Sequence, residues 1–194
     1  MTPRRSVYLA GPEVFLPDAP SVMARKAALC AEFGFDALVP GDNDPAVSAS
    51  PADGQGVSMA IYRANLELMT LADFGVFNLT PFRGPSADVG TAFELGLMTG
   101  LGKRVYGYTD VVADYADRVP TRSEVGLGGL LRDEQGWLVE TFGRADNLML
   151  DCALEASGAQ ILRNPTPPTQ RLRDVTGLAA CLAQARADLF ASAA

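Results

Sequence analysis

Short runs of apolar residues alternate along this chain with longer stretches in which apolar side chains recur every three or four positions. The apolar runs predict β-strands at 6–10, 35–39, 74–79 and 103–108, with shorter ones at 137–140 and 160–162. The helical spacing predicts α-helices over 21–33, 57–71, 89–101, 144–156 and 172–194, the last of them packed on the outside. Strands that alternate with helices are typical of βαβ units, so the pattern predicts an α/β fold with a parallel sheet covered on both faces.

Two polar segments, 40–56 and 109–129, are too long for tight connections between these elements. Segment 40–56 fits a lid or a substrate wall, and it fits a surface insertion equally well. The chain has 194 residues, of which 48% are hydrophobic, and no internal repeat. We therefore expect a single domain, with a sheet core over about 5–150 and a C-terminal helical extension over 165–194.

Charge and hydropathy exclude several classes of partner. The chain carries 16 Lys and Arg against 23 Asp and Glu, a net charge of −7, whereas non-specific nucleic-acid binding needs a basic surface. No uninterrupted apolar stretch could span a bilayer and no secretory signal follows the early arginines, so a cytoplasmic protein without a membrane partner is expected. Cys30, Cys152 and Cys181 are odd in number and far apart, which predicts buried thiols, not disulfides or a metal site.

The sequence contains no histidine. This absence excludes a Ser-His-Asp triad, a Cys-His pair, an HExxH zinc site and any histidine general base. The chemistry of an active site must then come from carboxylates, tyrosine, lysine or backbone groups. A carboxylate that acts as a nucleophile satisfies this restriction.

The first candidate for such a carboxylate stands inside an otherwise apolar helix. Asp88 occupies the N-cap position after the loop 80–87, and Glu94 follows within the helix. Because a helical side chain leans toward the N-terminus, Glu94 projects over Gly90, which has no side chain and leaves space for a ligand. Beside the carboxyl end of a strand this arrangement is a candidate site, although a solvent-facing glutamate would give the same pattern.

Three motifs stand in order along the chain: VYLAGP at Val7–Pro12, DxGxxxE at Asp88–Glu94 after the loop NLTPFRGPSA, and DNLML at Asp146–Leu150. Together they resemble the nucleoside 2-deoxyribosyltransferase family over roughly residues 5–150. The resemblance implies a flavodoxin-like doubly wound sheet. It also implies transfer of the 2-deoxyribosyl group between nucleobases in nucleoside salvage, with 2′-deoxynucleosides and free nucleobases as ligands and no metal or organic cofactor.

The resemblance further implies roles for single residues. Glu94 would be the nucleophile that forms a covalent deoxyribosyl intermediate, and Tyr8 would hold its carboxylate by a hydrogen bond. The substrate-binding residues would be Asp88, which receives the 5′-hydroxyl of the sugar, together with Gly90, Gly11 and Ser86. Asn147 and Met149 would lie in a segment that one subunit lends to its neighbour's site, so a homo-oligomer of at least two subunits is expected.

One position departs from the family pattern. Asn65 falls where several family members carry an aspartate that assists the leaving base, so we expect Asn65 to orient the base. An asparagine donates hydrogen bonds but cannot supply a proton as a carboxylic acid does. The general acid is therefore open between Asp73, another carboxylate and none, and a structural role for Asp73 at the start of its strand is favoured.

Further residues and activities stay open. Arg83 and Ser86 could bind an anion, or Arg83 could be a solvated loop residue. Phe15, Phe82 and Phe93 could stack on a nucleobase, or could belong to the core. Two alternatives to the transferase are a hydrolase of the same superfamily that acts on a 5′-monophosphate, and a non-catalytic nucleotide-sensing domain.

Overall fold

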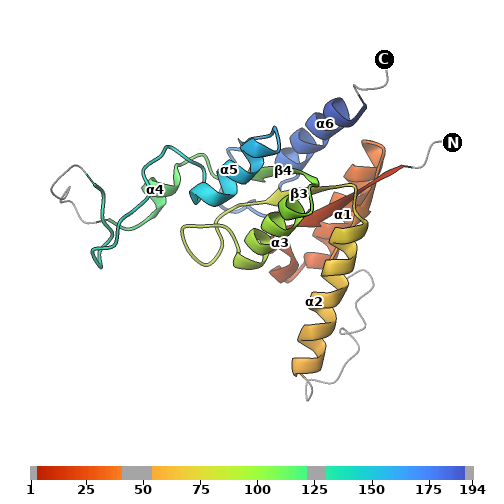
Figure 1. Cartoon of the computed structure of the whole chain (residues 1–194), viewed down its shortest axis with the longest axis horizontal. Helices are drawn as coiled ribbons and strands as arrows, with labels where there is room; N and C mark the ends of the chain where they lie inside the picture. The colour runs from red at the N-terminus through yellow and green to blue at the C-terminus, as the bar shows by residue number, and fades with distance from the viewer. Residues whose placement is uncertain (1–3, 41–53, 122–129, 191–194) are drawn as a thin grey trace.

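The computed structural model describes residues 4–40, 54–121 and 130–190, and is built around one parallel sheet (Figure 1). Its strands are β1 (Arg5–Ala10), β2 (Phe35–Leu38), β3 (Phe74–Asn78), β4 (Arg104–Thr109) and β5 (Ile161–Arg163). They follow the order β2-β1-β3-β4-β5, and every neighbouring pair is parallel. This is the strand order of flavodoxin-like doubly wound sheets, so the predicted α/β fold is confirmed.

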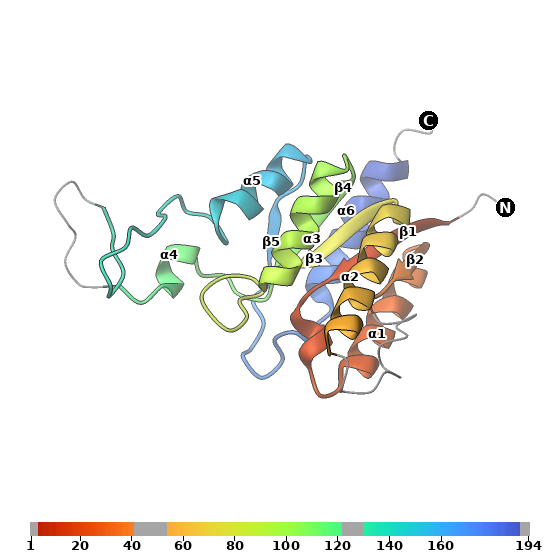
Figure 2. The same cartoon turned by 60° about the horizontal axis from the view of Figure 1, so that its bottom comes forward.

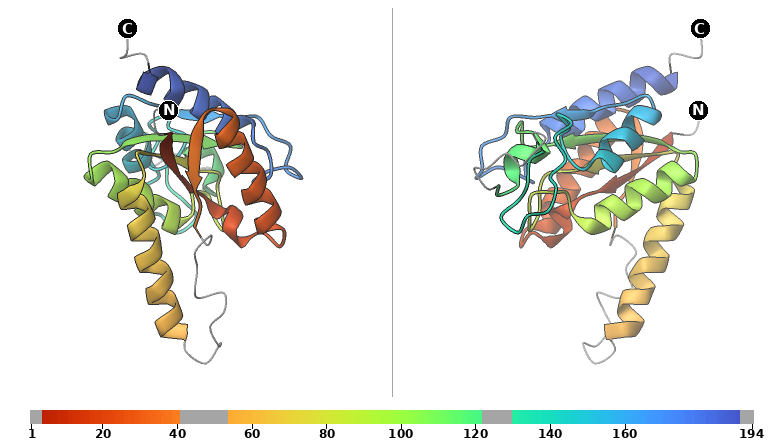
Figure 3. Two further views of the ribbon diagram at one scale, coloured as in Figure 1. Left: turned by 90° about the vertical axis from the view of Figure 1, so that its right-hand side faces the viewer. Right: turned by 60° about the vertical axis from the view of Figure 1, so that its left-hand side comes forward.

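Helices cover both faces of the sheet. The helical elements are the 3-10 helix η1 (Pro12–Phe15) and the α-helices α1 (Ala19–Glu32), α2 (Gly54–Leu71), α3 (Val89–Gly100), α4 (Tyr115–Arg118), α5 (Leu148–Ala156) and α6 (Thr176–Phe190). Buried residues of α1 and α6 form one core cluster with β1 to β4, and those of α2, α3 and α5 form a second cluster on the opposite face. Figures 2 and 3 show these two helical layers on either side of the strands.

The central strand β3 sets the position of the site. All five of its residues are buried, as expected for a strand covered on both faces. β1 and β3 are neighbours in the sheet, and the chain leaves them toward different layers: η1 and α1 follow β1 on one face, and α3 follows β3 on the other. Ligands of doubly wound sheets bind at the carboxyl ends of such diverging strands.

The final helix corrects one prediction. Helix α6 lies in an outer helical layer but buries one side firmly against the sheet, where Leu178, Cys181, Leu182 and Ala185 are fully buried. Gly177 lies so close to the ring of Tyr108 on β4 that any side chain at Gly177 would overlap it. The helix begins at Thr176 and not at 172, since Leu172 has the left-handed φ of 64°.

The predicted strand at 137–140 is wrong. Leu138 forms only an isolated antiparallel bridge with Arg132, and the fifth strand of the sheet is β5. Helix α5 likewise begins at Leu148 and not at 144. Asn147 is its N-cap and accepts a hydrogen bond from the backbone N–H of Met149 (3.0 Å), while Glu140 accepts one from the N–H of Leu148 (2.8 Å).

The described residues between β4 and α5 reach away from the sheet (Figures 1 and 2). Several large apolar side chains are exposed on them, namely Val112, Leu130, Trp137, Leu138 and Phe142, and Trp137 alone is 72% exposed. Segment 40–56, predicted as a lid or an insertion, lies mostly outside the described residues, although 54–56 belong to α2. Among the helices of the described ranges, none is long and apolar enough to cross a membrane.

The cysteines divide into two kinds. Cys30 on α1 and Cys181 on α6 are fully buried, as predicted. Cys152 on α5 is exposed, which corrects the expectation of three buried thiols.

The assignment of the whole chain to one domain stays a prediction.

Candidate active site

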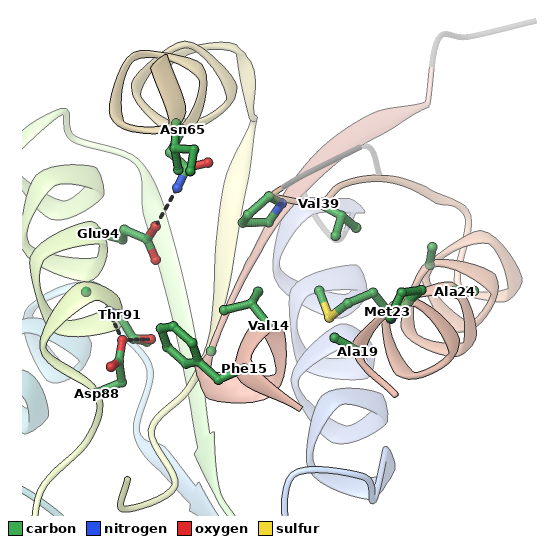
Figure 4. Close-up of a pocket in the computed structure, with 16 residues that line it drawn as sticks. Val14, Phe15, Ala19, Met23, Ala24, Val39, Asn65, Asp88, Thr91 and Glu94 are labelled. Carbon is green, nitrogen blue, oxygen red and sulfur yellow. Dashed lines mark hydrogen bonds between the residues drawn. The ribbon is translucent and has the colours of Figure 1, made fainter. Parts of the chain in front are cut away.

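Glu94 lies on α3, and its carboxylate contacts one side chain from β1 and one from α2. The hydroxyl of Tyr8 donates a hydrogen bond to Glu94 Oε1 at 2.7 Å, and the amide of Asn65 approaches the same oxygen at 3.5 Å. Within the described residues, the other oxygen, Oε2, has no hydrogen-bond partner. Figure 4 shows Asn65 and Glu94 facing each other across one end of a cavity. One carboxylate oxygen is thus held and the other is available.

The surroundings of Glu94 bring the pKa of its carboxyl group close to neutral pH. Burial raises the pKa of Glu94 from 4.5 to about 7, the hydrogen bond from Tyr8 opposes this rise, and the nearby carboxylate of Asp88 adds to it. Burial and the neighbouring Glu94 also raise the pKa of Tyr8, so its hydroxyl keeps its proton and remains a donor. Around neutral pH a substantial fraction of Glu94 is therefore ionised, as a nucleophilic carboxylate must be.

The start of α3 is fixed by Asp88. Asp88 Oδ2 accepts hydrogen bonds from the N–H of Thr91 (3.0 Å) and from its hydroxyl (3.3 Å), which confirms the predicted N-cap. Of the residues that the structure describes, a side chain at Gly90 would meet only Asp88 within contact distance, so on this side the space above the glycine is open to the cavity. The cap thereby sets both the helix that carries Glu94 and the opening in front of it.

The cavity beside Glu94 has a volume of about 690 Å³, within the range of small-molecule sites. Within the described ranges, its polar side chains come from α2 and from α3 with its N-cap, and they are Asn65, Asp88, Thr91 and Glu94. The opposite wall is formed by η1, α1 and the end of the β2 segment (Figure 4). The cavity therefore lies at the carboxyl ends of β1 and β3, where the strand order predicts a ligand.

The structure brings most of the predicted site residues together. Gly11, Asn65, Asp88, Gly90 and Glu94 line the cavity, and Tyr8 reaches it through Glu94. Ser86, Asn147 and Met149 are not among the lining residues. Asp73 lies at the other end of β3, where it accepts hydrogen bonds from the N–H (2.6 Å) and hydroxyl of Ser6, so it has the structural role that was favoured.

Ser86 contributes to the position of the loop after β3. Its hydroxyl donates to Asp146, which also accepts from the N–H of Ala87 (3.0 Å) and forms an ion pair with Arg118 (3.2 Å). Arg118 in turn donates to the carbonyl of Pro85 (2.8 Å). Asp146 and Arg118 thus fasten the loop that leads to Asp88. A role for Ser86 in substrate binding stays a prediction.

Asn147 and Met149 lie at the start of α5. The Asn147 amide donates to Glu140 (2.8 Å), and the side chain of Met149 is 69% exposed. Neither residue reaches the cavity of its own chain. Their place is compatible with contacts to another molecule.

The candidate aromatic residues separate into two pairs. Phe15, which lines the cavity, stacks on Phe82 with ring centroids 5.2 Å apart, and Arg83 lies over both rings at 5.0 and 4.7 Å. Phe93 instead contacts Tyr62 (6.4 Å) and does not line the cavity. Arg83 has a left-handed φ of 58° and pairs with no carboxylate in the described part of the chain. Of the three phenylalanines, Phe15 is the one positioned to contact a ligand directly.

A buried ionic cluster behind the cavity wall was missed by the sequence analysis. Lys26 forms an ion pair with Glu13 and donates to the hydroxyl of Tyr108 (2.9 Å), while Asn78 donates to Glu13 (2.6 Å). Glu13 is 1% exposed and Lys26 is 3% exposed. Gly11 lies against the Glu13 carboxylate, which a side chain at that position would overlap. The cluster fastens η1 and α1, and hence one cavity wall, to the carboxyl ends of β3 and β4.

Comparison with known proteins identifies the family. The profile of the nucleoside 2-deoxyribosyltransferase family matches residues 7–149. An uncharacterised protein of Schizosaccharomyces pombe is 33% identical over 165 residues, which cover 78% of each chain. A solved 2-desoxiribosyltransferase from Leishmania mexicana is 28% identical, with a TM-score of 0.57 over 75% of this chain and 85% of its own. This chain belongs to the nucleoside 2-deoxyribosyltransferase family.

Removing the Tyr8 hydroxyl is expected to raise the pKa of Glu94 above about 7. In Tyr8→Phe the hydrogen bond that stabilises the ionised carboxylate is lost, while the burial that opposes ionisation remains. The carboxylate stretching band gives this pKa directly in infrared titrations, if the spectrum of Glu94→Gln is subtracted to isolate the band. An unchanged midpoint in Tyr8→Phe would show that Tyr8 does not tune Glu94.

Proposed function

We propose that this protein transfers the 2-deoxyribosyl group from one nucleobase to another through a covalent intermediate on Glu94. The observation that carries the proposal is the carboxylate of Glu94, with one oxygen held by Tyr8 and the other turned to an open cavity. Membership of the family supports the same reaction class. No histidine is required for it, in agreement with the composition.

The reaction consists of two displacements at the anomeric carbon. Glu94 Oε2 attacks this carbon while the bond to the base nitrogen breaks and its electron pair leaves with the base. The transition state resembles an oxocarbenium ion, which a nearby carboxylate stabilises. The departing base takes up a proton from water. A nitrogen of the second base then attacks from the vacated face, the bond to Glu94 breaks, the carboxylate is restored, and the N–H proton of the attacking nitrogen passes to water. Two inversions leave the configuration of the sugar unchanged.

The remaining polar residues of the cavity orient the two parts of the substrate. Asn65 can donate a hydrogen bond to the departing base, although it cannot supply a proton. Asp88 uses Oδ2 to cap α3 and can accept a hydrogen bond from the 5′-hydroxyl of the sugar. The sugar then lies against α3, and the base points across the cavity.

The direct test is a base-exchange assay. The purified protein is incubated with a 2′-deoxynucleoside and a different free base, and the products are separated by chromatography. A new deoxynucleoside supports the transferase. Free base and free deoxyribose without a new nucleoside would instead support an N-glycosidase, and no reaction with any purine or pyrimidine pair would refute both enzymatic functions.

Asp88 is expected to select a free 5′-hydroxyl over a 5′-phosphate. A phosphate would place about two negative charges near this carboxylate, and each pair of unit charges at about 4 Å costs on the order of 4 kcal/mol at an effective dielectric of about 20. We expect kcat/KM for thymidine or deoxyadenosine to exceed that of the 5′-monophosphate by at least about a hundredfold, even if Arg83 offsets part of the repulsion.

The matched variant for this prediction is Asp88→Ser. Serine retains an N-cap for α3 but removes the charge, so the preference for the free hydroxyl should shrink. A preference of the wild-type protein for the monophosphate would overturn the assignment of Asp88 and favour the hydrolase.

We also propose that Asn147 and Met149 complete the site of a neighbouring subunit in a homo-oligomer. Glu94→Ala and Asn147→Ala proteins should each be inactive, yet a mixture under subunit exchange should recover activity. In a dimer, half of a random mixture is hybrid and each hybrid has one intact site, so about a quarter of the wild-type activity is expected. Hybrid formation is verified by native mass spectrometry, and hybrids without activity would contradict sharing.

A further inference from the structure

The cavity that holds Glu94 has two unlike halves. One half, on α2 and α3, carries all the polar side chains that line it among the described residues. The other half is a face of α1 made of small or apolar side chains, namely Ala19, Pro20, Met23, Ala24 and Ala27. Figure 4 shows Ala19, Met23 and Ala24 on the far side of the cavity from Glu94 and Asp88, with Val39 beside them. We refer to the five α1 residues as the α1 face.

The backbone of α1 offers this half no donor either. Pro20 has no N–H, and the N–H groups of Ala19 and Ser21 already bond to the carbonyls of Leu16 and Asp18 at 3.0 Å. The N–H of Val22 also bonds to Asp18 (3.2 Å). A polar group pressed against the α1 face would therefore lose its bonds to water without replacement, which is unfavourable.

The position of the α1 face is fixed by the buried side of the same helix. Val22, Lys26 and Cys30 form that buried side, which adjoins the α1 face, and Lys26 is bound to Glu13 and Tyr108. Helix α1 therefore cannot easily move inward to close the space that its alanines leave. The space is a formed part of the cavity and suits an apolar occupant.

We propose that the α1 face is a subsite for an apolar substituent on the nucleobase. The inference rests on the proposed function, in which the sugar lies against Glu94 and Asp88 and the base points across the cavity. An alkyl or aryl group on the far edge of the base then reaches Met23 and Ala24. The preferred substrates are 2′-deoxynucleosides, and free bases, that carry such a group.

The test compares donors that differ only in the substituent. Two series are assayed with a constant acceptor: deoxyadenosine with N6-benzyl-deoxyadenosine, and deoxyuridine with 5-phenyl-deoxyuridine. In at least one series the aryl donor should show a kcat/KM at least about tenfold above its parent, mainly through KM, because apolar area is removed from water. A carboxymethyl group at the same position should not show this gain.

Two α1 variants locate the effect. Ala24→Phe fills the space and should lower the ratio of aryl to parent kcat/KM by more than about tenfold. Glu32→Phe lies two turns further along the same helix, is exposed and does not line the cavity, so it should leave the ratio unchanged. The subsite is refuted if the parent donors have the same kcat/KM as the aryl donors. It is also refuted if the ratio of aryl to parent kcat/KM is the same in the two variants. Neither result would refute the transferase function.

Failure of the proposed function gives a different result. If no donor reacts, calorimetry of N6-benzyladenine against adenine, on the wild type and on Ala24→Phe, still decides the subsite. Tighter binding of the benzyl base that is lost in Ala24→Phe supports it, and equal binding of the two bases refutes it.

Discussion

Replacing Glu94 by glutamine is expected to reduce base exchange by at least about a thousandfold, as for other catalytic nucleophiles. The amide preserves the shape of the side chain but cannot attack the anomeric carbon or stabilise an oxocarbenium ion. Glu94→Ala should be equally inactive. A second observable is a covalent deoxyribosyl adduct on the peptide that contains Glu94, which quenching and mass spectrometry should detect in the wild type only.

As the pH rises, the stability of the wild-type protein should fall while its activity rises. The pKa of Glu94 is about 7 in the folded protein and 4.5 as its ordinary value, so the folded state holds the proton longer than the unfolded state. Its contribution to the free energy of unfolding therefore falls as pH rises from about 4.5 to 7, by about 3 kcal/mol in total. The Tm of Glu94→Gln relative to wild type should rise over this window.

The control for the Glu94 variants is another glutamate, on the neighbouring helix α2. Glu67 is exposed on α2 and does not line the cavity, so Glu67→Gln should keep wild-type activity and pH dependence. A Glu94→Gln protein that retains more than a few per cent of the turnover, at any pH, would remove Glu94 from the mechanism.

Replacing Lys26 by methionine should lower the free energy of unfolding by about 3–5 kcal/mol, the usual cost of breaking a buried ion pair from one side. Glu13 would remain buried with Asn78 and Tyr108 as its hydrogen-bond donors but without a positive charge. Urea unfolding measures the change, with the m-value checked for two-state behaviour. The double variant Glu13→Gln, Lys26→Met removes both charges and should recover much of the loss.

Arg25 provides the matched comparison for Lys26. It is the preceding residue of α1 but is exposed, and it donates one hydrogen bond to the carbonyl of Arg173 (2.8 Å). Arg25→Met should therefore cost less than about 1 kcal/mol. If Lys26→Met is as mild as Arg25→Met, the buried pair does not hold η1 and α1 in place.

The sequence predicted best the segments where several local signals agree. The strand β3, the N-cap Asp88 and the helix α3 each have a local sequence pattern of their own. The alternation of strands and helices follows from the spacing of apolar residues alone. The approach of Tyr8 and Asn65 to Glu94 joins three distant segments, and no spacing in the chain reveals it. The resemblance to a family supplied the pairing of Tyr8 with Glu94, and the structure supplies the distances.

The errors have equally physical causes. The helical spacing of apolar residues predicts Ala24 and Ala28 on the inward side of α1, but both are exposed and Lys26 is buried instead. A charged residue is expected outside unless its partner is known, and Glu13 is a partner from another element. The spacing of Val22, Lys26 and Cys30 by four residues was the available signal. The apolar run 137–140 failed as a strand because, in the described residues, it has no neighbour beyond a single bridge.

The unequal exposure of the three cysteines makes the protein convenient for fluorescence work. Burial raises the thiol pKa of Cys30 and Cys181 to about 12, so both are protonated and unreactive at neutral pH. Cys152 is exposed on α5, the helix that carries Met149. A maleimide dye should therefore attach at one defined position without any engineered cysteine. Energy transfer between donor- and acceptor-labelled copies would then report in real time whether, and how fast, chains exchange partners.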